Sequence, residues 1–359
     1  MSESYHKLEE LVDIPRLTAW LDTELPELGS GPLDVALLHG GHSNAVLSLN
    51  RGSETMVLRR PPVVPPPGST KSILREARLL RALNQTDVPH PECHAACDDE
   101  GVIGAPFYIM EMVTGWNPKI VDSKIVNEAP FDRPENARGV FTAVVDGLIQ
   151  LANVDYEAIG LSDYGKPGNF LERQVDRWAS QLASYPEKYD YTPRPLPDYQ
   201  LVEDWLRANT PKSYKPGIIH GDVGTPNMFF SRDIPTRLTA MLDWELSTIG
   251  DPLIDMGWFC GGMVDARVPE RGPASDLHDP AAVPTWQEMA ERYAAGTGRD
   301  VSEFDYYLVL AKFKSGCIME YKVALAAKGK MPREAGEFFK HIVDTSFAGA
   351  AELVRLAER

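Results

Sequence analysis

The stretch that most constrains this chain runs over residues 217–255, where short apolar runs alternate with polar groups at fixed spacing. Asp222 and Asn227 lie 227 − 222 = 5 positions apart, and Asp243 comes directly after an apolar run. An apolar run that ends in one polar group is typical of a buried strand with that group at its end. The run Met228–Phe230 predicts another short strand after Asn227. The three polar side chains are therefore expected on rigid supports.

These side chains suit one chemistry, the transfer of a phosphoryl group. Such a transfer needs little covalent help, but the acceptor hydroxyl must be oriented and the triphosphate charge neutralised by Mg²⁺. One carboxylate near the hydroxyl, with an Asn and an Asp on the metal, would meet both needs. The separation of Asp222 and Asn227 also matches the spacing of base and metal ligand in the catalytic loop of protein kinases. The stretch therefore predicts a phosphoryl-transfer centre.

The stretch contains three longer motifs: His-Gly-Asp at 220–222, Asp-Trp-Glu at 243–245 and Gly-Asp-Pro at 250–252. Together with Asn227 they resemble the aminoglycoside phosphotransferase family of kinase-like enzymes, and a looser similarity extends over most of the chain. The resemblance implies Asp222 as the catalytic base, with Asn227 and Asp243 as Mg²⁺ ligands. It also implies Asp255 as a buried acceptor that braces the catalytic loop. The alternative, an ordinary turn and strand end, is disfavoured because spacing and order agree.

The same resemblance implies an α+β, protein-kinase-like two-lobe fold. Residues 1–113 are expected to form a nucleotide-binding lobe, a small antiparallel sheet with one main helix, that ends in a hinge. Residues 114–359 are expected to form a larger, mostly helical lobe with the catalytic loop and the acceptor site. A chain of 359 residues with 43% hydrophobic residues is long enough for two such lobes.

The chain is acidic, since 36 Lys and Arg residues against 52 Asp and Glu residues give a net charge of −16. This balance disfavours binding to nucleic acid or to an anionic membrane. It favours a cationic or neutral acceptor only mildly, because an acidic surface also serves solubility. The sequence has no run of about 18 apolar residues, and its first residues lack the basic and then apolar pattern of a signal peptide. We therefore expect a cytoplasmic protein.

The chain has four cysteines, too few and too scattered for a disulfide framework: Cys93, Cys97, Cys260 and Cys317. The first two lie close to His90 and His94, which suggests a zinc site. This segment runs into a strand-like stretch, however, and strand neighbours cannot all face one ion. No second ligand pair follows at zinc-finger spacing. A zinc site is therefore not expected.

Ahead of the central stretch, residues 5–27 predict one or two helices and residues 34–60 predict three antiparallel strands. The turn between the first two strands holds candidates for a cover over nucleotide phosphates, because glycine permits close backbone approach and N–H groups cradle oxygens. These candidates are Gly40, Gly41, Ser43 and Asn44. Taken alone, a Gly-Gly hairpin is more often a simple turn. Its place before the catalytic stretch favours the phosphate-binding interpretation.

The third strand ends in two arginines, where kinase-like folds place a Lys against the α- and β-phosphates. Arg59 shares a strand face with Val57, so Arg59 is the candidate cation and Arg60 the alternative. Residues 70–83 predict a helix whose inward positions are Ile73, Ala77, Leu80 and Leu83. Glu76 lies where a kinase-like helix pairs its Glu with the strand cation, so we pair it with Arg59. An exposed Glu on an Arg-rich helix face is the alternative.

Val102–Ile103 and the run 106–113 predict a strand that leads into a Thr-Gly turn. The resemblance implies that this is the hinge, where the backbone of Glu111, Met112 and Val113 contacts the nucleotide base. Helical spacing then predicts helices over 137–152, 170–182, 199–206, 301–327 and 333–359. Loops are predicted over 185–197 and over 264–284, the second near the acceptor cleft.

The sequence thus predicts an Mg²⁺-dependent kinase that uses ATP or GTP to phosphorylate a hydroxyl of a small molecule. Candidate acceptors are aminoglycosides, amino alcohols, sugars and hydroxyacyl-CoA esters. The last candidate follows from a resemblance to the kinase-like domains fused to acyl-CoA dehydrogenases. A protein kinase is disfavoured, because His-Arg-Asp, Asp-Phe-Gly and Ala-Pro-Glu are missing. The alternative from another class is a nucleotide-binding pseudokinase or scaffold, whose expected mark is the loss of Asp222, Asn227 or Asp243.

Overall fold

The computed structural model describes residues 7–40, 44–65, 68–121, 124–263, 265–268 and 283–359. The chain forms two compact units. The first consists of Met1–Gly115, Glu157–Leu161 and Thr239–Glu245, and the second of Trp116–Tyr156, Ser162–Leu238 and Leu246–Arg359. The central stretch of the sequence is therefore divided between the units, because the segment with Asp243 belongs to the first.

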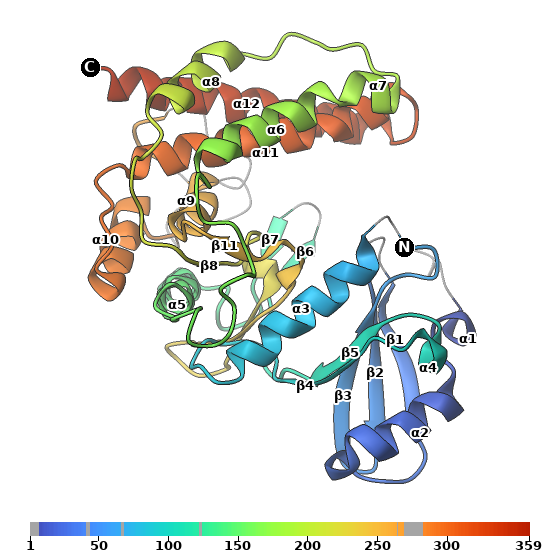
Figure 1. Ribbon diagram of the computed structural model, residues 1–359. Helices are drawn as coiled ribbons and strands as arrows, with labels where there is room; N and C mark the ends of the chain where they lie inside the picture. Colours follow the sequence, from blue (N-terminus) through green and yellow to red (C-terminus); the bar gives the residue numbers. More distant parts are fainter. Residues whose placement is uncertain (1–6, 41–43, 66–67, 122–123, 264, 269–282) are drawn as a thin grey trace. The chain divides into compact units, whose positions relative to one another are not determined.

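The first unit is built on a five-stranded antiparallel sheet in the order β1-β2-β3-β5-β4 (Figure 1). Its strands are β1 (Asp34–Gly40), β2 (Ala45–Arg51), β3 (Glu54–Arg60), β4 (Cys93–Cys97) and β5 (Phe107–Glu111). The predicted three-stranded antiparallel start is confirmed, since β2 pairs with both β1 and β3. The short turn at Gly52 and the β-rich runs on either side explain this meander.

The helical segments of the first unit are α1 (Leu8–Leu11), α2 (Ile14–Glu24), η1 (Pro26–Leu28), α3 (Ser69–Leu83) and α4 (Glu100–Ile103). Leu17 and Leu21 of α2 share a buried apolar cluster with Leu47, Leu49 and Phe107 of the sheet. The main helix α3 buries its predicted inward positions Ile73, Ala77, Leu80 and Leu83. The sheet, its one main helix α3 and the leading helices α1 and α2 therefore match the arrangement that the sequence predicts.

The strand predicted at Val102–Ile103 is wrong, because these residues end the short helix α4. Asp99 caps this helix by accepting a hydrogen bond from the N–H of Gly101 at 2.7 Å. Gly104, with φ +82°, ends it in the left-handed conformation. Start and stop signals of this strength outweigh the strand preference of two β-branched or apolar residues.

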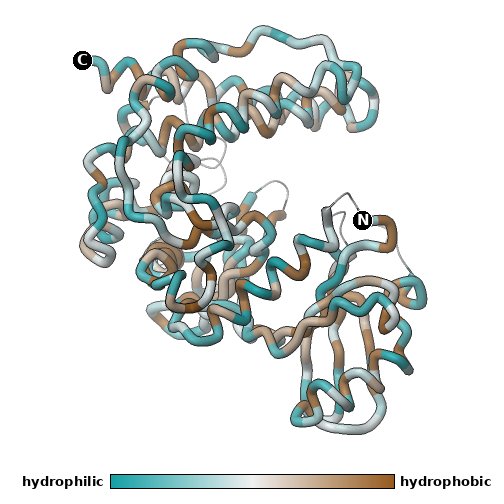
Figure 2. The backbone as a smooth tube through the Cα atoms, viewed as in Figure 1, coloured by the Kyte–Doolittle hydropathy of each residue, from teal (hydrophilic) through white to brown (hydrophobic). Residues whose placement is uncertain are grey.

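The second unit is mostly helical, as the fold class predicts. Its helices are α5 (Pro134–Ala152), α6 (Glu172–Ala183), α7 (Tyr185–Tyr189), α8 (Tyr199–Ala208), α9 (Leu253–Gly261), α10 (Trp286–Thr297), α11 (Phe304–Ala327) and α12 (Arg333–Ala357). Short strands accompany them: β6 (Lys119–Val121), β7 (Lys124–Val126), β8 (Gly217–Ile219), β9 (Met228–Phe230) and β11 (Thr248–Gly250). Figure 2 shows hydrophilic and hydrophobic residues interspersed along α12, as expected for a helix with one buried face. Most residues of the first half of α11 are buried instead.

Two 3-10 turns and one further strand lie in the central stretch of the sequence. The 3-10 turn η2 (Thr225–Asn227) precedes β9, and the chain passes from the second unit to the first within β10 (Leu238–Met241). The 3-10 turn η3 (Trp244–Leu246) follows Asp243. The predicted strands after Asn227 and before Asp243 are therefore confirmed.

The sequence predicts loops over 185–197 and 264–284. The segment 185–197 is not wholly a loop, because it contains α7, whose first turn accommodates Pro186. Most of the predicted loop 264–284 lies outside the described residues. None of the helices in the described part of the chain is both long and apolar enough to cross a membrane.

Helices α9 and α11 approach closely through two glycines. A Cβ on Gly257 would lie 2.6 Å from the Cβ of Tyr307, and one on Gly261 would lie 2.7 Å from the Cβ of Ala311. Larger residues would force the helices apart. The pair is also fixed by the hydroxyl of Tyr307, which donates to Asp251 at 2.5 Å.

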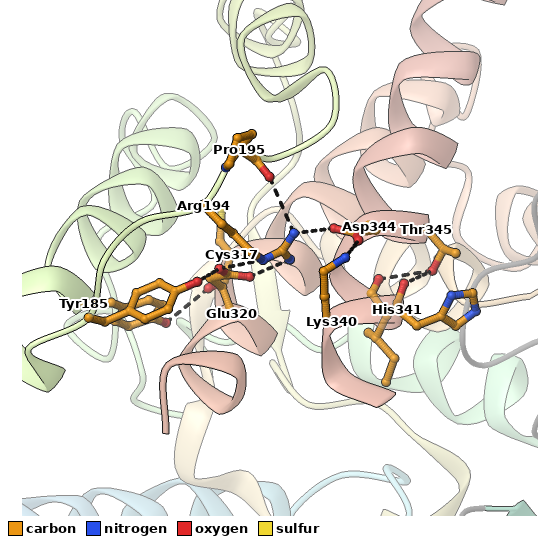
Figure 3. Close-up of polar contacts among 11 residues, drawn as sticks. Tyr185, Arg194, Pro195, Cys317, Glu320, Lys340, His341, Asp344 and Thr345 are labelled. Carbon is orange, nitrogen blue, oxygen red and sulfur yellow. Dashed lines mark hydrogen bonds and ion pairs between the residues drawn. The ribbon is translucent and has the colours of Figure 1, made fainter. Parts of the chain in front are cut away.

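A polar network holds α11 against its other neighbours (Figure 3). Arg194 donates from Nε and Nη2 to the two carboxylate oxygens of Glu320 on α11, at 3.0 and 2.8 Å. Its Nη1 donates to Asp344 on α12 at 2.6 Å. Glu320 is buried and also accepts a hydrogen bond from the hydroxyl of Tyr191 at 2.6 Å. This bidentate arrangement anchors α11, the helix that reaches the candidate site.

Candidate active site

The loop that contains the candidate base Asp222 begins directly after β8. Asp255, near the start of α9, is 2% exposed and accepts hydrogen bonds from the N–H of His220 at 2.6 Å and of Gly221 at 2.9 Å. Burial raises the pKa of Asp255, while His220 and the two N–H donors act in the opposite direction. The structure thus places Asp255 in the bracing position that the family resemblance implies.

Gly221 is required by the shape of this loop. Its φ is +90°, and a Cβ there would lie 2.7 Å from the backbone oxygen of Leu246. A side chain would meet both backbone strain and a clash. The loop therefore turns sharply just before Asp222, which places that carboxylate on a fixed backbone.

Asp222 and Asn227 are brought together as the spacing predicts. The side-chain nitrogen of Asn227 donates to the backbone oxygen of Asp222 at 3.0 Å and to its Oδ2 at 3.1 Å. The N–H of Asp222 donates to Nδ1 of His220 at 3.3 Å. Because its nitrogen is engaged by Asp222, the amide of Asn227 has its oxygen left for a cation. One residue is thus positioned by the other.

A third side chain at this loop, Lys314, has no counterpart in the sequence prediction. Its ammonium donates to the backbone oxygen of Gly221 at 3.2 Å and lies 3.9 Å from the ring centroid of Trp258. Burial lowers the pKa of Lys314 to about 8, while Asp222 and Asp255 act to raise it. A lysine inside a long helix has no local signal that marks it as part of a loop so distant in sequence.

The first unit contains a second charged centre, around Arg59. Its Nε lies 3.3 Å from Glu76, and its Nη2 lies 2.7 Å from Oδ1 of Asp243 and 3.8 Å from Glu245. The predicted pair of Arg59 and Glu76 is therefore present. Glu245 joins the centre through the side-chain nitrogen of Asn44, which donates to it at 3.2 Å. The sequence contained Glu245 in the Asp-Trp-Glu motif but gave no reason to assign it.

Burial shapes the electrostatics of this centre. It disfavours the charge of Arg59, but Glu76, Tyr108 and Asp243 outweigh this and raise the pKa of Arg59. Burial also raises the pKa of Glu76, against the attraction of Arg59. The guanidinium is therefore permanently charged, and it is the cation that holds the three acidic side chains together.

Arg60 differs from its neighbour completely. It is 3% exposed and donates to the backbone oxygens of Leu11, Ile103 and Pro61, the last two at 2.9 and 3.0 Å. The strand alternation thus selected the right arginine for the charged centre. Arg60 serves instead to tie α1 and α4 to the sheet.

The other nucleotide-binding candidates are only partly described. Gly40 ends β1 and Asn44 is 8% exposed, whereas Gly41 and Ser43 lie outside the described residues. Glu111 ends β5, and its N–H donates to the backbone oxygen of Glu92 at 2.9 Å. Met112 and Val113 follow in an irregular, half-buried segment. Their contact with a nucleotide base stays a prediction.

Asp243 adopts an unusual backbone conformation, with φ +65°. Residues other than glycine adopt this left-handed region at a cost, although Asp tolerates it better than most. Such outliers concentrate at functional positions, where the surrounding structure holds them. Here the neighbouring Trp244 provides such support, since its indole N–H donates to the backbone oxygen of Met241 at 2.8 Å.

A cavity of about 310 Å³ lies within the second unit and begins at the residue after Asp222. Its described lining is largely apolar and includes Phe141, Trp258, Phe259, Met263, Met319 and Ile342. The segment Val223–Pro226 forms one wall and α11 another. This position, next to the candidate base, makes the cavity the candidate acceptor pocket.

The pocket has few polar groups. The Oγ of Thr225 is buried and has no hydrogen-bond partner within the described part of the chain. Lys312, Ser315 and Ser346 also line the cavity, and the hydroxyl of Ser346 donates to that of Ser315 at 3.3 Å. Lys312 donates to the backbone oxygen of Gly261 at 2.8 Å, and burial lowers its pKa to about 8. No Asp or Glu is among the described lining residues.

The candidate metal ligands are of the type and number common at Mg²⁺ sites, where water and substrate complete the coordination shell. The candidate ligands Asn227 and Asp243 offer an amide oxygen and a carboxylate, which are hard ligands suited to this ion. Among the described residues, no group of three or more His, Cys, Asp or Glu could hold a metal. Mg²⁺ commonly uses one or two carboxylates and completes its shell with water and substrate phosphates. Asp243 belongs to the first unit and Asn227 to the second, so a shared Mg²⁺ site stays a prediction.

The fold and these residues define a class, the kinase-like enzymes that phosphorylate small molecules. Residues 34–298 match the phosphotransferase enzyme family, and the chain belongs to that family. A curated relative, the probable acyl-CoA dehydrogenase IBR3 of Arabidopsis thaliana, is 30% identical over an alignment of 330 positions that covers 85% of this chain and 38% of that protein. The chain spans 27% to 42% of the length of the first three curated relatives that it matches.

Solved structures agree with this assignment. A provisionally named aminoglycoside phosphotransferase from Ralstonia eutropha JMP134 is 30% identical, with a TM-score of 0.78, and covers 96% of this chain and 99% of its own. The GDP and kanamycin complex of APH(2")-IIia is 16% identical with a TM-score of 0.59, over 92% of this chain and 97% of its own. The second likeness shows the fold alone. The predicted family and the kinase-like fold class are thereby confirmed.

Proposed function

We propose that this enzyme transfers the γ-phosphoryl group of ATP or GTP to a hydroxyl of a small molecule that binds in the 310 Å³ pocket. The observation that carries the proposal is the fixed pair of Asp222 and Asn227 at the edge of that pocket. A carboxylate next to the wall Val223–Pro226 could accept the proton of a hydroxyl bound in the cavity. Asp222 is then the catalytic base.

The proposed reaction has a simple balance. The acceptor oxygen forms a bond to the γ-phosphorus while the bond from that phosphorus to the β,γ-bridging oxygen breaks. The hydroxyl proton passes to Asp222, and ADP or GDP leaves. The protein contributes mainly orientation and charge, because such transfers need little covalent help.

The charged centre of the first unit supplies the proposed nucleotide site. Arg59 would meet phosphate oxygens with its planar fork, while Glu76 holds it in place. The turn that includes Gly40, Gly41, Ser43 and Asn44 is proposed to cover the phosphates. The backbone of Glu111, Met112 and Val113 is proposed to contact the base. The GDP named in the APH(2")-IIia complex supports a nucleotide as cofactor.

We assign the proposed Mg²⁺ to Asn227 and Asp243. The ion would neutralise phosphate charge as the transfer proceeds. Asp243 forms an ion pair with Arg59 in the structure, so its carboxylate is already held in a fixed orientation. The left-handed backbone at Asp243 supports a functional rather than a structural reason for this residue.

The pocket favours an acceptor with an apolar part over an aminoglycoside. An aminoglycoside carries several positive charges, and the described lining offers it no carboxylate and one buried ammonium, that of Lys312. Like charges in such a site repel. An apolar chain that bears a hydroxyl, such as a hydroxyacyl-CoA ester, fits the lining better. The acyl-CoA dehydrogenase name of the Arabidopsis relative supports the same acceptor class.

The test is ADP or GDP release against a panel of aminoglycosides, amino alcohols, sugars and hydroxyacyl-CoA esters, with and without Mg²⁺. We expect acceptor-dependent release with a hydroxyacyl-CoA ester and its loss in Asp243→Ala. Release with aminoglycosides alone would contradict the acceptor class. Nucleotide binding without release on any acceptor, by a folded protein, would contradict the enzyme and favour a pseudokinase.

A further inference from the structure

Lys314 is a buried cation at the catalytic loop that the proposed reaction does not yet use. It is 8% exposed, and its ammonium lies 3.9 Å from the ring centroid of Trp258 and 5.3 Å from that of Trp178. Within the described residues its ammonium forms no ion pair with a carboxylate, although Asp222 and Asp255 lie close enough to favour its charge. Its hydrogen bond goes to the backbone oxygen of Gly221. A charge buried this way is costly, since aromatic faces and one carbonyl replace water only in part.

That carbonyl belongs to the peptide group that leads into Asp222. The N–H of the same peptide group donates to Nδ1 of His220 at 3.3 Å. The preceding N–H, that of Gly221, donates to Asp255. The peptide plane before Asp222 is therefore held on both sides, by His220 at its N–H and by Lys314 at its oxygen.

The hydrogen bond from Lys314 to the oxygen of Gly221 is important because Gly221 is in a left-handed turn. Gly221 has φ +90°, and a glycine has more conformational freedom than other residues, so its neighbouring peptide groups need contacts that hold them. A rotation of the next peptide plane would swing the carboxylate of Asp222. The bond from Lys314 opposes that rotation, and no other donor to the oxygen of Gly221 occurs among the described contacts.

We propose that Lys314 is a positioning residue for phosphoryl transfer, because its ammonium fixes the Gly221 carbonyl and thereby the direction of the Asp222 carboxylate. This inference rests on the proposed function, in which Asp222 is the base. Lys314 itself need not touch the substrate. Charge on the donor makes its hydrogen bond to the carbonyl stronger than that of a neutral donor.

Charged groups from three neighbouring elements act on Lys314. Asp222 in the catalytic loop and Asp255 on α9 favour its charge, while Arg177 on α6 opposes it. Burial outweighs the two carboxylates and brings the pKa of Lys314 to about 8. Loss of its proton above this pH removes the charge that strengthens the bond to Gly221. The transfer rate is therefore expected to fall as the pH rises through this value.

The experiment compares the wild type with Lys314→Met, Lys314→Arg and Lys322→Met. Methionine keeps the length and packing of the lysine stem without charge, arginine keeps the charge, and Lys322 is a half-buried lysine of the same helix that lies over Tyr321. We expect Lys314→Met to slow single-turnover transfer by about tenfold to a hundredfold, the range for one lost charge-assisted bond. Nucleotide affinity should not change. Lys322→Met should match the wild type.

The pH profile separates positioning from simple packing. The wild-type rate should fall through the pH of about 8 set by Lys314. Lys314→Arg, whose charge persists, should keep its rate at higher pH, and Lys314→Met should lack this limb of the profile. Equal profiles in the wild type and Lys314→Arg would overturn the proposal. So would a wild-type rate in Lys314→Met.

A second measurement is independent of activity. Hydrogen exchange of the peptide 217–230 should be faster by about tenfold in Lys314→Met than in Lys322→Met, with the core helices unchanged. Unchanged exchange in this peptide would overturn the positioning inference even if no acceptor is found. Absence of transfer by the wild type on every acceptor would instead contradict the proposed function. If Lys314→Met fails to fold, Lys314→Arg and its pH profile still decide.

Discussion

The two units each contain a buried cation, and their surroundings are opposite. Arg59 in the first unit lies among three acidic side chains, at 3.3 Å from Glu76, 2.7 Å from Asp243 and 3.8 Å from Glu245. Lys314 in the second unit has a carbonyl oxygen and aromatic rings instead. Accordingly the pKa of Arg59 is raised above its ordinary value and that of Lys314 is lowered.

The difference separates two uses of positive charge. A cation with a surplus of carboxylates can exchange partners, so in the proposed function Arg59 would bind phosphates and leave Asp243 to the proposed Mg²⁺. Lys314 donates to a backbone carbonyl and forms no ion pair among the described residues, although Asp222 and Asp255 favour its charge. Lys314 is therefore suited to hold backbone in place. The residue that binds and the residue that positions are distinguished by their neighbours rather than by their charge.

Asp222→Asn should have the largest effect, because it removes the proposed base and one of the carboxylates near Lys314. Asn keeps the volume of the side chain, so nucleotide affinity should hold. Single-turnover transfer should fall by roughly 10²–10⁴-fold, the usual contribution of a general base. Calorimetry for nucleotide binding and a rapid-quench assay for transfer, on the same preparation, give the two numbers.

The contrary result for Asp222 is also informative. If this residue only caps the loop, Asn is a fair substitute and transfer should stay near the wild-type rate. That outcome would remove the base assignment. It would also leave the fixed loop without the function that we give it.

Arg59→Ala against Arg60→Ala tests the first unit by a matched pair in adjacent positions. We expect Arg59→Ala to weaken nucleotide binding by about tenfold to a hundredfold, since it removes a charged donor from the phosphates. Arg60→Ala should leave nucleotide affinity unchanged. It should lower the free energy of unfolding by about 2–4 kcal/mol instead, because buried carbonyls such as that of Ile103 lose their donor. Titration calorimetry and urea unfolding on both variants provide the readouts, and a reversed ranking would contradict the assignment of Arg59.

Sequence patterns that act over short distances predicted much of this molecule. Strand alternation identified Arg59 rather than Arg60, and helical spacing gave the buried face of α3. The five-position separation placed Asn227 in contact with Asp222. These results depend on neighbours along the chain, which a sequence displays directly.

What the sequence did not predict depends on contacts between distant segments. Lys314 reaches Gly221 from a helix 93 positions further along the chain, and no local pattern marks it. Glu245 acquires its partners from Asn44 and Arg59 in the same way. At α4 the failure was local, because the cap at Asp99 outweighed the strand preference of Val102–Ile103.

The pH dependence of stability, compared between the wild type and Lys314→Met, tests whether burial lowers the pKa of Lys314. The pKa of Lys314 is lowered from 10.5 to about 8 in the folded state, so between these values the unfolded chain holds a proton that the folded chain lacks. Stability then rises with pH in this window. We expect the free energy of unfolding of the wild type, relative to Lys314→Met, to increase by about 2 kcal/mol between roughly pH 7 and 9.5. Urea unfolding of both proteins across this range measures this increase. A difference that does not change with pH would mean that folding does not lower the pKa of Lys314.

Thr225→Val is expected to have the smallest effect, and it tests what the second unit's loop offers to an acceptor. Thr225 is 3% exposed, lines the pocket and has a hydroxyl without a partner among the described residues. Valine keeps its shape, so only one hydrogen bond to the acceptor can be lost, and the acceptor KM should rise by about threefold to tenfold. Thr236→Val is the matched control, because that buried hydroxyl already donates to Ser231 at 2.7 Å. The control should lose stability and keep its KM, whereas an unchanged KM in Thr225→Val would mean that the acceptor does not use this hydroxyl.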